Sequence, residues 1–194
     1  MIFKEEPMPP RTRITKEDIV KTALMLVREK GEEAINARSI ASALSCSTQP
    51  IFSNFFTMEE VRREVIGAAY EAYLSFLQSE VESEKYPPYK AYGMAYIRFA
   101  KQEKELFRLL FLRDRTKEDI SPTPDFEESV KMIMRANGVT EETARRMHLE
   151  MWAAVHGIGT MLATAFLPLE WELISDMLTD IYQGIRQKHL LKEK

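Results

Sequence analysis

The sequence of 194 residues has few histidines and a single cysteine, two residue types on which many catalytic and metal sites depend. Its three histidines lack zinc-type spacing, no nucleophile has an evident neighbouring base, and there is no glycine-rich phosphate loop. A single cysteine, Cys46, excludes an internal disulfide and fits a reducing compartment. We interpret it as a small buried residue, with a redox sensor as the alternative. These absences argue against an enzyme, so we expect neither a cofactor nor a metal.

Positive charge is also scarce, since the formal net charge is −3. That balance argues against a general nucleic-acid coating protein and against a polybasic membrane binder. The N-terminus lacks the apolar core of a secretion signal, so we expect a cytoplasmic protein. Residues 151–169 carry no formal charge and are long enough to imitate a membrane span, but they include His156, Thr160 and Thr164. We therefore expect a buried helix there and no membrane partner.

What the chain does contain is apolar residues at helical spacing, with no strand-like alternation and no internal repeat. A capping signal at Thr15 and a glycine at Gly31 delimit a first amphipathic helix. A second capping signal, Thr57 with Glu60, opens a long helix that we expect to run to about Ser83. The predicted fold is all-α. It has an N-terminal three-helix head, the long fourth helix as connector and a helical C-terminal body.

Further helices are predicted in the body beyond Pro87-Pro88, and one of them spans Asp125 to Asn137. A polar stretch with prolines at residues 113–124 is predicted to be an exposed loop. We place the domain boundary at the start of the long helix. Residues 1–56 then form a DNA-binding domain with an N-terminal arm, and residues 57–194 form an effector-binding and dimerisation domain.

Residues 36–60 fit two short helices joined by a tight turn and followed at once by a third helix start. Asn36 caps the first short helix, Ser45-Cys46 forms the turn, Ser47 caps the second, and Pro50 falls in its first turn, where a proline costs little. This arrangement is a helix-turn-helix and indicates DNA binding. The alternative is a small helical hairpin that only contributes to an all-α core.

The second short helix carries compact hydrogen-bonding side chains at its N-terminal end. Gln49 can address adenine through both of its amide groups, and Thr48 or Ile51 can touch a thymine methyl. Because no charged residue lies between Arg38 and Glu59, attraction to phosphates must come from the flanks. The predicted DNA-binding residues are therefore Arg13, Lys16, Arg38, Ser47, Thr48, Gln49, Ile51, Phe52 and Asn54.

From Ile19 to Val61 these signals follow the layout of TetR-type transcriptional regulators, which the chain resembles. The stretches that carry the resemblance are Arg38-Ser-Ile-Ala, Ser47-x-x-x-Ile-Phe-x-Asn-Phe and Thr57-Met-Glu-Glu-x-Val. The resemblance implies a regulator that binds DNA through its helix-turn-helix. It also implies a homodimer formed by the last two long helices.

Three residues depart from the family pattern. Ser45 stands where the turn usually has glycine, so a left-handed backbone there bears a strain of order 1 kcal/mol. Phe52 replaces the usual tyrosine, and its spacing from Phe55 predicts that this side of the helix packs against the head. Met58 replaces a lysine that commonly contacts the DNA backbone, which leaves only the helix dipole there.

The last two helices predict a dimer interface. Small residues recur from Ala153 onwards, and apolar residues from Trp171 onwards follow the three- and four-residue steps of a helix-packing seam. A dimer would present two reading heads to the halves of a palindrome. The alternative is that both helices pack within one monomer. The predicted interface residues are Ala153, Gly157, Thr160, Thr164, Trp171, Ile174, Leu178, Ile181 and Ile185.

The body is rich in aromatic and methionine side chains, and Trp152-Ala-Ala-Val-His156-Gly157 is similar to a pattern in some TetR-type members. Trp152 and His156 lie one helical turn apart and can line a cavity together, although a histidine on a packed helix is more often hydrogen-bonded core. Core packing is the alternative for every residue of the predicted apolar effector pocket. That pocket comprises Tyr73, Phe76, Tyr96, Phe99, Phe107, Phe111, Met132, Trp152 and His156.

The sequence thus predicts a homodimeric, DNA-binding repressor that leaves a palindromic operator when a small apolar or amphipathic ligand enters the body. Its expected partners are double-stranded operator DNA, a second copy of itself and a small-molecule effector of unknown identity. An activator, or a regulator without an effector, fits the same residues. The alternatives from other classes are a helical protein-interaction adaptor and a small helical enzyme.

Overall fold

The computed structural model describes residues 13–116 and 123–191. The predicted N-terminal arm at residues 1–12, part of the predicted loop at residues 117–122, and residues 192–194 lie outside the described residues. Every regular element in the described ranges is helical, which confirms the all-α prediction. In chain order these are α1 (Lys16–Lys30), the 3₁₀ turn η1 (Glu32–Ala34), α2 (Ala37–Ala43), α3 (Gln49–Asn54), α4 (Met58–Glu82), α5 (Pro88–Gln102), α6 (Lys104–Phe107), the π-helical segment η2 (Arg108–Leu112), α7 (Pro124–Asn137), α8 (Glu141–Ala163) and α9 (Trp171–Leu190).

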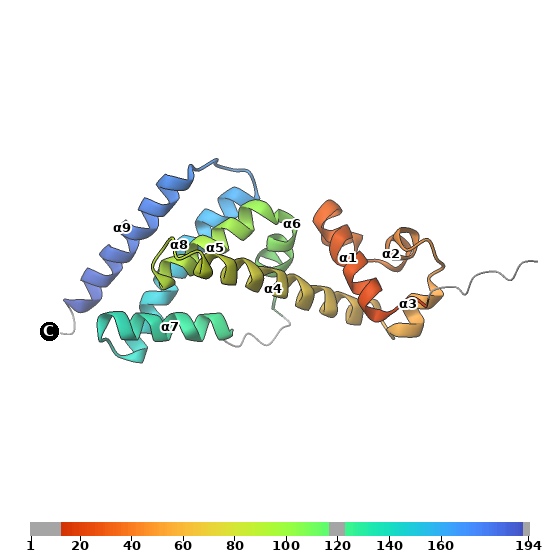
Figure 1. Cartoon of the computed structure of the whole chain (residues 1–194), viewed down its shortest axis with the longest axis horizontal. Helices are drawn as coiled ribbons and strands as arrows, with labels where there is room; N and C mark the ends of the chain where they lie inside the picture. The colour runs from red at the N-terminus through yellow and green to blue at the C-terminus, as the bar shows by residue number, and fades with distance from the viewer. Residues whose placement is uncertain (1–12, 117–122, 192–194) are drawn as a thin grey trace, which may run out of the picture.

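The helices are arranged along the longest axis of the molecule (Figure 1). α1, α2 and α3 form the head at one end, α4 runs from the head into the body, and α7 and α9 lie at the far end. α5 is the central helix of the body, since it packs against α4, α7, α8 and α9. The head meets the body through α1, which packs against α4 and α6.

α1 and α2 begin at the capping residues that the sequence predicts, and α1 ends at the predicted glycine. Thr15 Oγ1 accepts a hydrogen bond from Asp18 N at 3.1 Å, and Asp18 Oδ2 accepts one from Thr15 N at 3.0 Å, so the capping box of α1 is complete. Gly31 ends α1 with φ at +80°, which glycine adopts without steric cost. Asn36 caps α2 by accepting a hydrogen bond from Ser39 N at 2.9 Å.

The turn between α2 and α3 differs in part from the prediction. Ser45 has φ at +52°, so this serine does hold the left-handed conformation that glycine adopts more readily. The residue that precedes α3 is Thr48, and its side chain makes no cap hydrogen bond, so the prediction that Ser47 caps this helix is wrong. Thr48 already has helical backbone angles, whereas a side-chain cap usually requires an extended residue. Pro50 lies in the first turn, as predicted.

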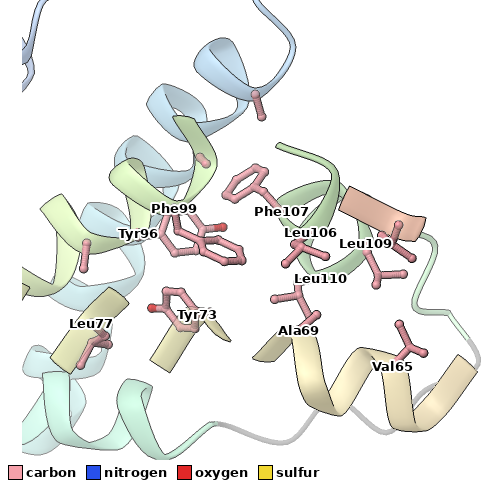
Figure 2. Close-up of a cluster of buried hydrophobic side chains, with 14 of the residues drawn as sticks. Val65, Ala69, Tyr73, Leu77, Tyr96, Phe99, Leu106, Phe107, Leu109 and Leu110 are labelled. Carbon is pink, nitrogen blue, oxygen red and sulfur yellow. The ribbon is translucent and has the colours of Figure 1, made fainter. Parts of the chain in front are cut away.

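α4 is the predicted long connector, and it ends at Glu82. Thr57 caps its first turn by accepting a hydrogen bond from Glu60 N at 3.2 Å. Glu60 Oε2 accepts from Phe56 N at 2.9 Å, so the expected capping box is half formed. The side of α4 that faces the core is drawn in Figure 2, which labels Val65, Ala69, Tyr73 and Leu77.

The core of the body is aromatic (Figure 2). Phe99 and Phe107 are fully buried, and Tyr73 packs edge-on against Phe99 with ring centroids 5.6 Å apart. α8 approaches this cluster closely at Gly159, where an added Cβ would lie 3.2 Å from Phe107 Cζ and 3.3 Å from Tyr96 Cε1. A larger residue at this position would therefore push α8 away from α5 and α6.

The uncharged run at residues 151–169 divides between a helix and the segment that follows it. α8 ends at Ala163, and Ala165 turns the chain with φ at +54°. Phe166, just beyond the turn, is 80% exposed. Within the two described ranges, no helix combines the length and the apolarity that crossing a bilayer requires.

Candidate functional site

The exposed side of α3 forms the first candidate site. Ser47 and Gln49 are exposed at the start of the helix, and Thr48 between them is partly buried. Phe52 is 50% exposed one turn later, so the prediction that this side of the helix packs against the head is wrong for Phe52, while Phe55 is buried. The difference arises because Phe55 follows the last residue of α3 and has an extended backbone, so helical spacing does not fix its direction relative to Phe52.

Two of the predicted DNA-binding residues hold the head together. Ile51 is fully buried, so it cannot reach a thymine methyl, and that prediction is wrong. Asn54 Nδ2 donates hydrogen bonds to Ile14 O at 3.2 Å and to Pro50 O at 2.8 Å. Asn54 therefore fixes α3 against the segment that enters α1, and its amide nitrogen is occupied by backbone carbonyls.

The three cationic side chains of the prediction lie outside α3, on α2 and where the chain enters α1. Arg13, Lys16 and Arg38 are all exposed, and the first two lie where the chain enters α1. Lys16 Nζ lies 5.0 Å from the centroid of the Phe55 ring, which holds this charge beside the end of α3. The hydrogen bond from Asn54 to Ile14 O joins the same two segments, so the structure holds the segment that carries Arg13 and Lys16 at the C-terminal end of α3.

Two exposed residues of this surface are absent from the sequence prediction. Ser53 follows Gln49 by one helical turn and donates a hydrogen bond to Gln49 O at 2.9 Å. Phe56 is 92% exposed between α3 and α4. Helical spacing from Gln49 identifies Ser53 on the same side, whereas nothing in the residue type of Phe56 indicates that it points outwards.

The second candidate site is a cavity of about 1190 Å³ in the body, bounded by α4, α5, α7, α8 and α9. The structure places five of the nine predicted pocket residues in its wall. They come from five separate elements and are Tyr73, Tyr96, Phe111, Met132 and Trp152.

The other four predicted pocket residues do not line the cavity, so the prediction is wrong for them. Phe99 and Phe107 are fully buried in the core, and Phe76 packs edge-on against Phe99 with centroids 5.3 Å apart. His156 lies behind the wall, where its Nδ1 shares a hydrogen bond of 2.8 Å with Tyr96 Oη and its ring stacks on Trp152. These side chains support the cavity wall from the core side.

A carboxylate in the cavity wall was not predicted. Asp125 lies in the first turn of α7, and its two oxygens accept hydrogen bonds from Tyr70 Oη at 2.6 Å and Tyr73 Oη at 3.4 Å. Burial, followed by the interaction with Asp125, raises the pKa of both phenols, so they remain protonated donors. The sequence shows Asp125 only as an acidic residue near a helix start, which is common at the surface.

A histidine forms part of the same wall. His148 Nδ1 shares a hydrogen bond of 2.9 Å with Tyr89 Oη, and Phe126 packs edge-on against the imidazole with centroids 4.6 Å apart. Burial lowers the pKa of His148 to about 4, so the ring is neutral near pH 7. Burial also lowers the pKa of His156.

The predicted dimer seam on α9 is used within the monomer. Ile174 and Leu178 are buried in the body core, and Ile181 and Ile185 pack against it, so the interface prediction is wrong for Ile174 and Leu178. Trp171 packs against the guanidinium of Arg98, whose Cζ lies 4.9 Å from the centroid of the indole ring. The three- and four-residue spacing identified a packed face correctly, but spacing cannot tell which partner covers it.

The small-residue stripe on α8 remains accessible in the monomer. Ala153 and Thr164 are exposed, Thr160 is partly buried, and an added Cβ at Gly157 would meet nothing within 4 Å. Large apolar side chains lie exposed on α8, on the following segment and on α9. They are Leu149 (58% exposed), Phe166 (80%), Leu167 (43%) and Leu173 (49%).

A chain of contacts joins the cavity to the head. Phe111, in the π-helical segment η2, lies in the cavity wall with its ring centroid 5.5 Å from that of Tyr73. The same stretch of chain forms α6, which packs against α1. At that junction Arg28 Nε of α1 donates to Glu103 Oε2 at 3.0 Å. The stretch of chain that carries Phe111 into the cavity wall therefore also contacts α1.

Comparison with known families gives a match for most of the body. Residues 89–181, from α5 into α9, match the family described as "Tetracyclin repressor-like, C-terminal domain". None of the curated proteins matches the chain. The matched segment contains most of the cavity wall and the exposed apolar surface of α8, while the head lies outside it.

Proposed function

The chain belongs to the TetR family of transcriptional regulators, and we propose that it is a homodimeric repressor that binds a palindromic DNA operator. The DNA-binding proposal rests on α3, a short helix with an exposed Gln49 at its start, whose last residue, Asn54, is bonded to the segment that carries the exposed Arg13 and Lys16. In this proposal residues 1–56 are the DNA-binding domain, and residues 57–194 bind the effector and the second subunit.

Base reading is assigned to the exposed start of α3. Gln49 pairs with adenine in the major groove, and the hydroxyls of Ser47 and Thr48 bind neighbouring base edges or phosphates. Because α3 itself carries no charge, Arg13, Lys16 and Arg38 supply the attraction to phosphates. Phe52 adds an apolar contact that suits a thymine methyl, in place of the buried Ile51.

The second subunit is assigned to the exposed surface of α8 and its neighbours. Leu149, Ala153 and Gly157 follow one another at four-residue spacing on α8, and Leu173 of α9 is also exposed. Exposed apolar residues gathered on two long helices of one protein indicate a protein interface. A twofold axis through this surface directs the two heads towards the same face of a DNA duplex.

Release from the operator is assigned to ligand binding in the cavity. A ligand that displaces Phe111 shifts η2 and α6, and α6 carries the displacement to α1 across the Arg28–Glu103 ion pair. The two heads then take a spacing that no longer fits successive major grooves. The ligand changes DNA affinity only to the extent that it binds the two arrangements with different affinity.

Selection of binding sites from random duplex DNA tests this proposal. The purified protein is compared with Gln49→Ala and with Gln102→Ala, a matched control that removes an exposed glutamine of the body. We expect the wild type and the control to enrich one palindrome, and Gln49→Ala to lose or relax the preference by about 1–3 kcal/mol per half-site.

The dependence of DNA affinity on salt concentration separates recognition of base sequence from electrostatic attraction to phosphates. Arg38→Ala should weaken binding to all DNA sequences alike. It should also reduce the slope of the logarithm of affinity against the logarithm of salt concentration by about one, as expected for the loss of one phosphate contact. If no sequence is enriched at low or at moderate salt concentration, the helix-turn-helix has a structural role only and does not bind DNA specifically. The helical adaptor then becomes the better interpretation of the exposed apolar surface.

A further inference from the structure

We propose that the body cavity binds a hydrophobic organic cation, whose charge is held by the Asp125 carboxylate and by the faces of the surrounding tyrosine rings. This inference rests on the proposed function, because it names the chemical class of the effector that the cavity takes. It depends on three features of the wall: an uncompensated negative charge, a ring of electron-rich aromatic faces and the position of the basic side chains.

The first feature is the environment of Asp125. Its carboxylate receives hydrogen bonds from the neutral hydroxyls of Tyr70 and Tyr73, and among the described residues no cation forms an ion pair with it. Hydrogen bonds from neutral donors stabilise a negative charge without cancelling it. The charge therefore remains available to a ligand, and a cation is the partner that gains from it.

The second feature is the aromatic wall next to this carboxylate. Tyr73 contacts Tyr70 and Phe111 with ring centroids 5.8 and 5.5 Å away, and Phe111 lies 4.7 Å from Tyr96. Ring faces carry the negative part of the aromatic quadrupole, so rings around a cavity attract a cation, and most strongly one that is weakly hydrated. A small metal ion would lose its hydration shell without replacement, whereas an organic onium ion loses little.

The third feature is where the basic side chains of the wall lie. Arg135 and Arg186 are exposed at the α7 and α9 side, where Arg135 pairs with Glu128 and Arg186 donates to Asn137 Oδ1 at 2.8 Å. Lys90 Nζ donates to Thr179 Oγ1 at 2.8 Å. Arg115 also lines the cavity and has an interaction of its own. Lys90 and Arg186 keep their positive charges, because a neutral acceptor does not cancel them. Their partners are Thr179 of α9 and Asn137 at the last residue of α7, whereas Asp125 lies in the first turn of α7 and is bound by tyrosines of α4.

The neutral state of His148 agrees with this assignment. Its imidazole contributes to the wall without a positive charge near pH 7, because burial lowers its pKa. An anionic ligand that approached Asp125 would be repelled by its carboxylate, and His148 would offer it no positive charge. A cavity of about 1190 Å³ with mostly apolar walls accommodates a ligand with several rings.

Tetraphenylphosphonium and tetraphenylborate test the charge preference directly, because they share one shape and carry opposite charges. The full-length protein carries Trp171→Phe, which leaves Trp152 of the cavity wall as the one tryptophan, and its fluorescence reports binding. We expect tetraphenylphosphonium to bind at least about tenfold more tightly than tetraphenylborate.

Asp125→Asn is the decisive variant, since asparagine keeps one oxygen that accepts from one of the two tyrosines, Tyr70 or Tyr73, but removes the charge. We expect it to weaken tetraphenylphosphonium binding about tenfold and to leave tetraphenylborate unchanged or tighter. Asp176→Asn, an exposed aspartate of α9 outside the cavity, is the matched control and should change neither. Thermal unfolding of each variant verifies that the fold is retained.

Equal binding of the two ions, binding of neither ion, or an unchanged affinity for the cation in Asp125→Asn would overturn the inference. The operator selected with the wild type provides a separate readout. If the cation binds with the expected preference but the protein binds no operator, the cavity assignment stands and the regulatory function fails. If the operator is bound and the two ions bind equally well, the regulatory function stands and the ligand class is wrong.

Discussion

The head and the body cavity are both built from helices, but they place their polar side chains in opposite directions. The head presents polar side chains outwards from one short helix, and it uses Ile51 and Asn54 of that helix to hold itself together. The cavity instead gathers polar groups inwards from helices far apart in the chain, as in the pairing of Tyr70 with Asp125. A reading surface thus depends on how one helix is rotated, whereas a cavity depends on how several helices meet.

The largest effect is expected from the core on which the cavity depends. Phe107→Ala removes a fully buried ring, so the free energy of unfolding should fall by about 3–5 kcal/mol. Phe56→Ala in the head removes a ring that is 92% exposed and should change it by less than about 0.5 kcal/mol. Denaturant unfolding of both variants measures the difference. Similar losses would show that Phe56 is covered in solution.

A smaller loss of stability is expected within the head itself. Ile51→Ala leaves a cavity in the head and should lower the free energy of unfolding by about 2–4 kcal/mol. Phe52→Ala should leave stability nearly unchanged and weaken operator binding instead, because Phe52 is half exposed beside Gln49. Unfolding and DNA titration of the two variants distinguish a packing residue from a contact residue. A stable Ile51→Ala protein with weakened DNA binding would reverse this assignment.

A pH-dependent effect is expected from the cavity wall. The pKa of His148 is lowered to about 4 in the folded protein, while an unfolded histidine titrates near 6.5. The unfolded state therefore binds the extra proton first, and stability falls as the pH decreases from about 6.5 towards 4, by on the order of 3 kcal/mol in full. Urea unfolding between pH 7 and 4 measures this slope. His148→Gln should flatten it, and an unchanged slope would assign the dependence to other groups.

The smallest effect is expected at the entry to the head. Thr15→Ala removes the side chain that accepts from Asp18 N, which should cost about 1 kcal/mol. Thr143→Ala, inside the first turn of α8, keeps the Thr140 cap and serves as a body control with a smaller loss. Thermal unfolding provides the comparison. A loss at Thr15 no greater than that at Thr143 would show that the α1 cap contributes little.

The sequence predicted the head more accurately than the cavity because its signals are local. The caps at Thr15, Asn36 and Thr57 depend on residues three positions apart, and all three occur in the structure. The cap at Ser47 was wrong because the backbone entering α3 is already helical. Likewise, the orientation of Phe52 depends on how α3 docks against the rest of the head, which spacing alone does not show.

The cavity was predicted in part, because aromatic content indicates an apolar interior but does not separate wall from core. Phe99 and Phe107 are as apolar as Phe111, yet only Phe111 faces the open space. Asp125 follows Tyr70 by 55 positions, and no local signal pairs them. The spacing on α9 showed a packed face, and the monomer core covers Ile174 and Leu178.

The sequence by itself determined that the chain is helical, where α1, α4 and α7 begin and end to within about one residue, and which segment has the helix-turn-helix layout. These features follow from interactions between residues within one or two helical turns of one another. Only the tertiary structure decided which side of α3 is exposed, which aromatic rings enclose the cavity, and that Asp125 lies among tyrosines. Those outcomes depend on the rotation and docking of whole helices, because packing brings residues together that chain order leaves far apart.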